Sequence, residues 1–290
     1  MTREGPGGLQ FVDISNALAE ATICTQGAQL LRWQPRALPQ PVTFVADAAQ
    51  YVAGRSVRGG IPICWPWFGP HPTDASLPSH GFARNLPWEV GDAHQLPDGT
   101  TRQSFALRDN DTTRALWPHP FRLDCCVTVG ETLDIEIVSI NTGPVSITIT
   151  EALHTYFLVG DVGTIEVHGL EGTQYADTAA GGTPRQQAGA VRFAGEVDRV
   201  FQGTAADCTI VDPLMRRRIV IEKTGSRSTV VWNPGAQKAA RLADLGDASA
   251  ARVGWRQMVC IESANALDDR VMIAPGESHR IAVKYRVAPL

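Results

Sequence analysis

Apolar and polar residues alternate with a period of two in short segments along most of the chain, and this pattern limits the folds open to it. In "ETLDIEIVSIN" (131–141), Leu133, Ile135 and Ile137 share one face, and Ser139 extends the series. Successive side chains of a strand point to opposite faces, so the alternation predicts a half-buried β-strand. Similar runs occur at "LQFVDI", "ATICT", "GTIEVHGL", "CTIVD", "RRIVIEK", "STVVWN", "QMVCIE", "RVMIA" and "HRIAVKYRV".

The connections between these runs favour an antiparallel architecture. The run after "NTGP" places Val145, Ile147 and Ile149 in step, so we predict a hairpin between 131–141 and 145–159. Only two segments indicate helices: 236–246, ended by Gly246 as a C-cap, and a shorter one at 45–53. Many strands with few helices predict an all-β fold, a large sandwich or barrel. No linker or repeat divides the chain, so we expect one domain over residues 1–290.

Composition excludes several classes of partner. Hydrophobic residues make up 43% and charged residues 19%, which is typical of a globular protein, and the net charge is −4. That charge provides no general attraction to nucleic acid or anionic lipid. No apolar run approaches the roughly 20 residues of a membrane helix, and residues 1–15 contain no apolar signal segment. We therefore expect a cytoplasmic protein that binds neither nucleic acid nor membrane.

The cysteines support a reducing compartment. No C-x-x-C motif is present, and one adjacent pair cannot easily bridge to itself. We predict mostly buried free thiols, with a disulfide-bonded exported protein as the alternative. The six positions are Cys24, Cys64, Cys125, Cys126, Cys208 and Cys260.

Motifs for common cofactors are absent from the sequence. There is no dinucleotide-binding G-x-G-x-x-G after a strand, no P-loop, no H-E-x-x-H and no EF-hand loop. The seven histidines show no short spacing typical of a metal site. We expect neither cofactor nor metal, although ligands that converge from distant strands remain an alternative.

Two stretches carry arginines that alternation does not explain. In "SVRGGIPICWPWFGP" (56–70), Arg58 precedes two glycines, where backbone can approach a ligand closely. In "SHGFARN" (79–85), His80 and Arg84 lie four residues apart on a glycine-marked stretch. A guanidinium can hold a phosphate through two parallel hydrogen bonds, so both arginines are candidates for an anion site. The alternative is that they are surface residues or partners in ion pairs.

Two further stretches place a titratable group on an apolar strand. His154 lies in "EALHTYFLVGD" (151–161), and Glu262 ends the apolar run of "QMVCIESANA" (257–266). A lone histidine on such a strand is often a hydrogen-bonded core residue. A buried carboxylate without a partner is costly, so Glu262 requires either a cationic partner or a functional role.

Taken in order, five motifs resemble a known family. The series R-G-G-I-P, H-G-F-A-R-N, L-H-T-Y-F, W-N-P and M-V-C-I-E, from Arg58 to Glu262, is similar to the hexose-6-phosphate mutarotases, or glucose-6-phosphate 1-epimerases, of the aldose 1-epimerase (galactose mutarotase-like) superfamily. The resemblance implies a large antiparallel β-sandwich with the sugar in a cleft on one sheet. It also implies interconversion of the α and β anomers of a hexose 6-phosphate, with D-glucose 6-phosphate as the expected substrate, by a monomeric protein.

The resemblance also implies roles for single residues. His154 matches the general acid and Glu262 the general base, while Arg58 and Arg84 match the arginines that meet the phosphate. His80 matches a histidine beside the substrate.

Three further positions are less closely matched. Asp177, in "QYAD", matches an aspartate that hydrogen-bonds sugar hydroxyls. Ser79 stands where some relatives have glutamine, so its expected substrate contact departs from the pattern. Gly235 follows "WNP" where many members have an aromatic residue, and we interpret this departure as one that opens the cleft. Either Phe82 or Trp67 is a candidate to stack on the sugar ring, with a place in the core as the alternative.

Three other functions remain open from the sequence. The same reaction on a free aldose needs no phosphate site, and a sugar-phosphate binding protein needs no acid–base pair. A structural or interaction protein needs neither. The presence of both His154 and Glu262 favours an enzyme over the last two.

Overall fold

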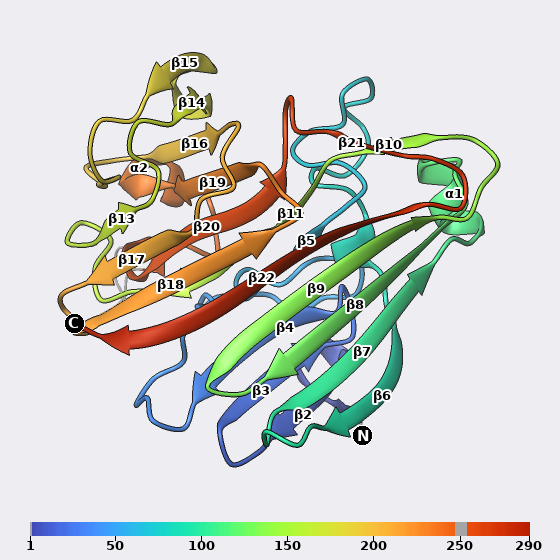
Figure 1. Ribbon diagram of the computed structural model, residues 1–290, viewed down its shortest axis with the longest axis horizontal. Coiled ribbons are helices and arrows are strands. Elements are labelled where there is room, and N and C mark those ends of the chain that lie inside the picture. The colour runs from blue at the N-terminus through green and yellow to red at the C-terminus, as the bar shows by residue number, and fades with distance from the viewer. Residues whose placement is uncertain (1, 247–253) are drawn as a thin grey trace.

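The computed structural model describes residues 2–246 and 254–290, and antiparallel strands dominate it (Figure 1). A four-stranded sheet forms the N-terminal part, with strands joined in chain order. Its strands are β1 (Thr2–Glu4), β2 (Gln10–Ser15), β3 (Ala19–Cys24) and β4 (Gln29–Pro35).

The first large sheet, here called the β9 sheet, has eight strands that cross the molecule side by side (Figure 1). Buried and part-exposed residues alternate strictly along two neighbouring strands inside it, β8 and β9, as the sequence predicts. In spatial order the strands are β13 (Glu166–His168), β17 (Cys208–Asp212), β18 (Arg217–Thr224), β22 (Ser278–Pro289), β9 (Thr132–Asn141), β8 (Phe121–Val129), β7 (Thr101–Arg108) and β6 (Glu89–Gln95).

The second large sheet, here called the β20 sheet, also has eight strands. In spatial order they are β15 (Thr183–Gln186), β14 (Gln174–Asp177), β16 (Val197–Phe201), β19 (Ser228–Asn233), β20 (Met258–Asn265), β11 (Glu151–Leu153) and β5 (Ile63–Cys64), with β12 (Tyr156–Leu158) also paired to β20. A separate pair is formed by β10 (Ile147–Ile149) and β21 (Val271–Ile273).

Both faces of the β20 sheet are covered at its centre. Every residue of β19 and β20 is buried. On one face Val259 and Ile261 join the main core, which also holds residues of the β9 sheet. On the other face Cys260 joins a smaller cluster with Tyr156. Because neither face of these strands meets solvent freely, a polar side chain here is held in a low-dielectric environment.

Helices are few and short. They are α1 (Asp111–Leu116), α2 (Gly235–Ala239) and the 3₁₀ turns η1 (Pro6–Gly8), η2 (Ala83–Asn85), η3 (Thr178–Ala180) and η4 (Gly254–Gln257). None of the helices within the described residues is long and apolar enough to cross a membrane. The prediction of an all-β antiparallel fold is confirmed.

Three local predictions are wrong. The segment 131–141 does not form a hairpin with 145–159, because β9 pairs with β8 and β22 while β10 pairs with β21. Residues 45–53 form turns and bridges instead of a helix. The helix expected at 236–246 ends at Ala239, and the chain continues in turns to Gly246. All six cysteines are free thiols, and five of them are buried, as expected.

Candidate active site

Strand register places His154 directly opposite Glu262. Leu153 pairs with Ser263 and Tyr156 pairs with Cys260. Continuing this register places His154 opposite Glu262 on β20. Cross-strand partners on one face are close neighbours. Accordingly, His154 Nε2 lies 3.3 Å from Glu262 Oε1, and the two side chains are only 10% and 1% exposed.

The surroundings of this pair shift both pKa values strongly. Burial raises the pKa of Glu262 well above its ordinary value, and the negative charge of Asp198 raises it further. Burial lowers the pKa of His154 well below its ordinary value, and the positive charges of Arg84 and Arg58 lower it further. Both shifts favour the uncharged forms, a protonated Glu262 and a neutral His154.

Two buried polar atoms of the pair have no protein partner. Glu262 Oε2 and His154 Nδ1 make no hydrogen bond within the described residues. An unsatisfied buried polar atom is costly, so these atoms are suited to a ligand that enters the site.

Aromatic rings form one wall beside His154. The Tyr156 ring stacks on the His154 imidazole at 4.9 Å between centroids and 16° between planes. Trp232, from β19, meets His154 edge-on at 6.1 Å. The His80 ring lies edge-on to the His154 ring, at 5.6 Å between centroids. These contacts hold the imidazole in one orientation.

Both predicted arginines line one polar cavity of about 220 Å³ next to Tyr156. Arg84 donates from one terminal nitrogen to the Ser79 carbonyl at 2.7 Å, and its buried Nε has no partner. Arg58 donates from Nη1 to the Tyr156 hydroxyl at 3.2 Å and from Nε to Asp244 at 3.0 Å. Burial alone lowers the pKa of Arg58, but Tyr156 and Asp244 outweigh it and raise that pKa.

Close backbone packing requires the two glycines after Arg58. Gly60 has φ +61°, and a Cβ there would lie 2.1 Å from the carbonyl oxygen of Leu30. Gly59 is likewise crowded by the backbone at Phe44. Backbone packing therefore explains the two glycines of this R-G-G pattern, and it fixes the backbone from which the Arg58 side chain extends.

His80 and Ser79 lie on a loop, from which the His80 ring contacts the His154 ring. Burial lowers the pKa of His80 to about 3, and the charges of Arg84 and Arg58 add to the effect, so its ring is neutral. Its backbone N–H donates to Gly69 at 2.7 Å. Ser79 is exposed and contributes its carbonyl to Arg84.

Asp177 lies away from the His154–Glu262 pair. It ends β14, three strands from β20, or about 14 Å at the usual spacing of strands. Its carboxylate lies 3.7 Å from Arg185 Nη1. The described contacts therefore do not join Asp177 to the pair, and its role toward a sugar stays a prediction.

A different aspartate, Asp198 on β16, lies closer to the pair. Asp198 is in register with Trp232, which is in register with Cys260, so all three share the face that carries Glu262. Its charge raises the pKa of Glu262, and the charge of Asp177 raises the pKa of Asp198. Burial raises the pKa of Asp198, and Lys238 Nζ lies 3.9 Å from its carboxylate.

Gly235 does not open the cleft, contrary to our interpretation of the sequence. Its φ is +61°, and a Cβ there would lie 2.6 Å from the backbone nitrogen of Glu196. Backbone at residues 195–196 therefore fills the place that a side chain would take. The Asn233 side chain accepts a hydrogen bond from the Gly235 N–H at 2.9 Å and holds the turn.

The aromatic residues Phe82 and Trp67 are core residues. They are 1% and 5% exposed and pack in the main core. Tyr156 and Trp232 instead face His154. The alternation "HTY" puts Tyr156 beside His154, but nothing in the sequence connects Trp232, Asp198 or Asp244 to this site.

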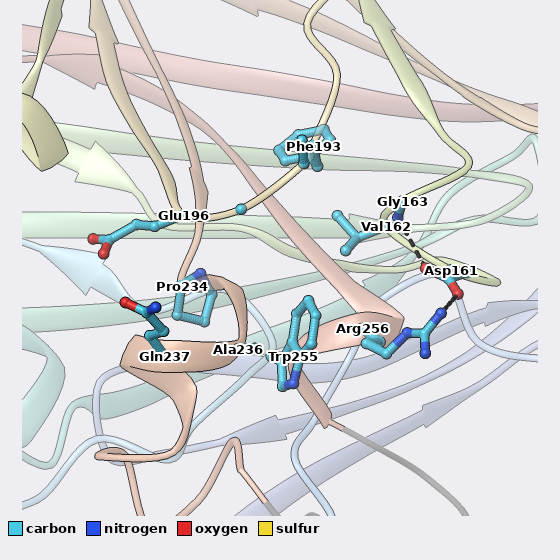
Figure 2. Close-up of a pocket in the computed structure, with 12 residues that line it drawn as sticks. Asp161, Val162, Gly163, Phe193, Glu196, Pro234, Ala236, Gln237, Trp255 and Arg256 are labelled. Atoms are coloured by element: carbon cyan, nitrogen blue, oxygen red, sulfur yellow. Dashed lines mark hydrogen bonds and ion pairs between the residues drawn. The ribbon is translucent and has the colours of Figure 1, made fainter.

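A larger hollow lies elsewhere, near the end of β19 and the start of β20. Its volume is about 490 Å³, and it includes none of the site residues predicted from the sequence. Figure 2 shows Phe193, Val162, Pro234 and Trp255 around it, with the ion pair of Asp161 and Arg256 at one side. It has no acid–base pair comparable with His154 and Glu262.

Known proteins are similar to this chain in fold and in sequence over nearly its whole length. A protein of Escherichia coli K12 named "putative glucose-6-phosphate 1-epimerase" is 33% identical over 282 residues, covering 97% of this chain and 91% of that protein. A crystal structure titled "putative mutarotase" from Salmonella typhimurium has a TM-score of 0.90 at 31% identity, covering 100% of this chain and 93% of the other.

A more distant structure agrees in fold. A galactose mutarotase-like protein from Lactobacillus casei has a TM-score of 0.74 at 15% identity, covering 96% of this chain and 100% of that one. Residues 10–286 match the family described as aldose 1-epimerase. This match and the relatives together show that the chain belongs to the aldose 1-epimerase family.

Proposed function

We propose that the protein interconverts the α and β anomers of a hexose 6-phosphate, with D-glucose 6-phosphate as the preferred substrate. The observation that carries the proposal is the buried His154–Glu262 pair, 3.3 Å apart, beside a cavity lined by two arginines. The family accounts for a sugar substrate, and the names of the relatives support the phosphate.

The pair is suited to the two proton transfers of the reaction. Glu262, as carboxylate, takes the proton of the C1 hydroxyl, while His154, as imidazolium, gives a proton to the ring oxygen. The C1–O5 bond breaks as the C1=O1 bond forms, which gives the open-chain aldehyde. Rotation about C1–C2 and the reverse transfers close the ring with the other configuration. Each positioned group contributes about 10²- to 10⁴-fold.

Substrate binding changes the proton affinity of both groups of the pair in this proposal. In the free protein burial favours a protonated Glu262, and positive charge from Arg58 and Arg84 disfavours a cationic His154. A bound phosphate neutralises that charge. His154 then gains affinity for a proton, while Glu262 loses the lowering of its pKa by Arg84, so the balance between the two forms of the pair depends on where the phosphate sits.

The cavity near Arg58 and Arg84 supports a phosphate-binding role. Arg84 Nε has no protein partner, and a guanidinium binds a phosphate well through its parallel N–H groups. The phosphate lies away from C1, so the arginines provide binding and orientation, not proton transfer.

Two-dimensional NMR exchange between the α and β anomeric protons tests the proposal. Glucose 6-phosphate, free glucose and free galactose are compared with wild type, His154→Ala and Glu262→Gln. We expect accelerated exchange for the phosphate, lost in both variants. Acceleration of free sugars alone would overturn the phosphate specificity, and saturable binding without exchange would overturn the enzymatic function.

A further inference from the structure

We propose that His154, Cys260 and Glu262 form a binding site for a soft divalent cation of the Zn²⁺ type, and that the ion inhibits the protein by occupying the acid–base pair. One ligand atom from each residue lies within 4.8 Å of the other two, and all three residues are buried. Within the described residues this is the sole group of its kind.

The scaffold holds the three ligands rigidly. Cys260 and Glu262 are two residues apart on β20 and point to the same face, and His154 faces Glu262 from the adjacent strand. Ligands of a tetrahedral zinc ion lie about 3.5 Å apart, given bonds of about 2.0 to 2.3 Å. The His154–Glu262 separation of 3.3 Å already fits this value, so only the thiol has to approach.

The donor set selects the metal. Thiolate and imidazole ligands favour Zn²⁺ and Co²⁺, whereas Mg²⁺ prefers oxygen ligands. Binding releases the protons of the Cys260 thiol and the Glu262 carboxyl to solvent, and the cation supplies the charge that keeps the thiolate and carboxylate stable in the interior. Three protein ligands leave a fourth position for water or a sugar hydroxyl.

Occupation of this site blocks proton transfer. A bound cation takes the Nε2 lone pair of His154 and a carboxylate oxygen of Glu262, the atoms that the proposed reaction uses. Binding itself does not depend on the proposed function, but the inhibition does. A spectroscopic measurement therefore separates the two.

Co²⁺ titration of the full chain followed by absorption spectroscopy is the primary test. We expect a thiolate-to-cobalt charge-transfer band that saturates at one equivalent and is displaced by Zn²⁺. Cys260→Ser should abolish the band. Cys64→Ser is the matched control, because Cys64 is buried in the same cluster but is not one of the three ligands. No band, or an unchanged band in Cys260→Ser, overturns the site.

Anomer exchange measured with added metal tests the inhibition. Each variant is compared with its own metal-free rate. We expect Zn²⁺ to inhibit wild type and Cys64→Ser, Cys260→Ser to require at least about tenfold more Zn²⁺ after loss of the thiolate ligand, and Mg²⁺ to have no effect. Equal sensitivity of Cys260→Ser, or a cobalt band without any loss of turnover, would contradict the proposed inhibition.

Discussion

Arg58 Nε and the Asp244 carboxylate lie 3.0 Å apart and join segments separated by 186 positions in the sequence. The two side chains are 31% and 24% exposed. Asp244 follows α2, whereas Arg58 lines the cavity together with Arg84 and Tyr156. The ion pair thus places a negative charge next to the proposed phosphate site.

Asp244→Asn should strengthen binding of the phosphate. The amide oxygen of asparagine still accepts from Arg58 Nε, but the charge that repels a phosphate is gone. A part-exposed charge contributes about 1 kcal/mol at this range, so KM for glucose 6-phosphate should fall about fivefold at low salt and less at high salt. KM for free glucose should not change. A higher KM for the phosphate would show that Asp244 mainly orients Arg58.

Arg58→Gln and Arg84→Gln should each weaken binding of the phosphorylated sugar. A charge-assisted hydrogen bond contributes about 1.5–3 kcal/mol, so KM for glucose 6-phosphate should rise at least about tenfold. Exchange of free glucose should change little. Arg108→Gln, an exposed arginine on β7, is the control. Equal losses for both sugars would exclude a phosphate-specific role.

His154 should be neutral in the free protein near neutral pH and should gain a proton more readily when phosphate binds. Burial and nearby positive charge lower its pKa, and an anion on Arg58 and Arg84 removes part of that charge. Imidazole ¹⁵N chemical shifts across a pH titration, with and without inorganic phosphate, measure the effect. The exposed His94 is the internal reference. An identical His154 titration in both conditions would contradict the coupling.

Wild type should lose stability at alkaline pH because the buried Glu151 ionises, and Glu151→Gln should remove this loss. Burial raises the pKa of Glu151 from 4.5 to about 8, partly opposed by a hydrogen bond from Ser139. Between these two values the folded form keeps a proton on Glu151 that the unfolded form has lost. The resulting stabilisation is complete below pH 4.5 and is lost as pH rises through about 8. The difference is on the order of a few kcal/mol.

Urea unfolding at about pH 5 and about pH 9 measures this prediction. Wild type should lose more stability between the two than Glu151→Gln. His279 Nε2 lies 3.3 Å from the Glu151 carboxylate, and burial lowers the pKa of His279, so it gives little compensation. Glu89→Gln, with an exposed side chain, serves as the control. Parallel pH profiles for wild type and Glu151→Gln would refute the prediction.

Gly235→Ala should destabilise the protein by about 3 kcal/mol or more, because a positive φ and a backbone clash act together. Gly189→Ala is a matched control with φ +69° and nothing within 4 Å of the added Cβ. It should cost about 1 kcal/mol. Thermal unfolding of both variants compares them, and equal melting temperatures would show that the turn at Gly235 relaxes.

The sequence by itself determined the strands, because alternation is a local property. The runs at 131–141, 208–212 and 228–233 are strands in the structure. Strand pairing is not a local property, so the hairpin prediction was wrong. β9 pairs with β22, which lies at the far end of the chain.

Most of the site came from the resemblance of five motifs, not from any pattern of single residues. His154, Glu262, Arg58, Arg84 and His80 lie around one region, as that resemblance implies. Asp198 and Asp244 could not be recognised, because single carboxylates in an alternating strand or a polar turn look like ordinary solvent-facing residues.

Tertiary structure alone decided the chemistry of the site. Register between distant strands sets His154 opposite Glu262, and packing on both faces of β20 removes the water that would otherwise hold their pKa values near ordinary. The same packing brings Cys260 to the pair. Residue types are fixed by the sequence, but distances and dielectric surroundings exist only once the sheets have closed on one another.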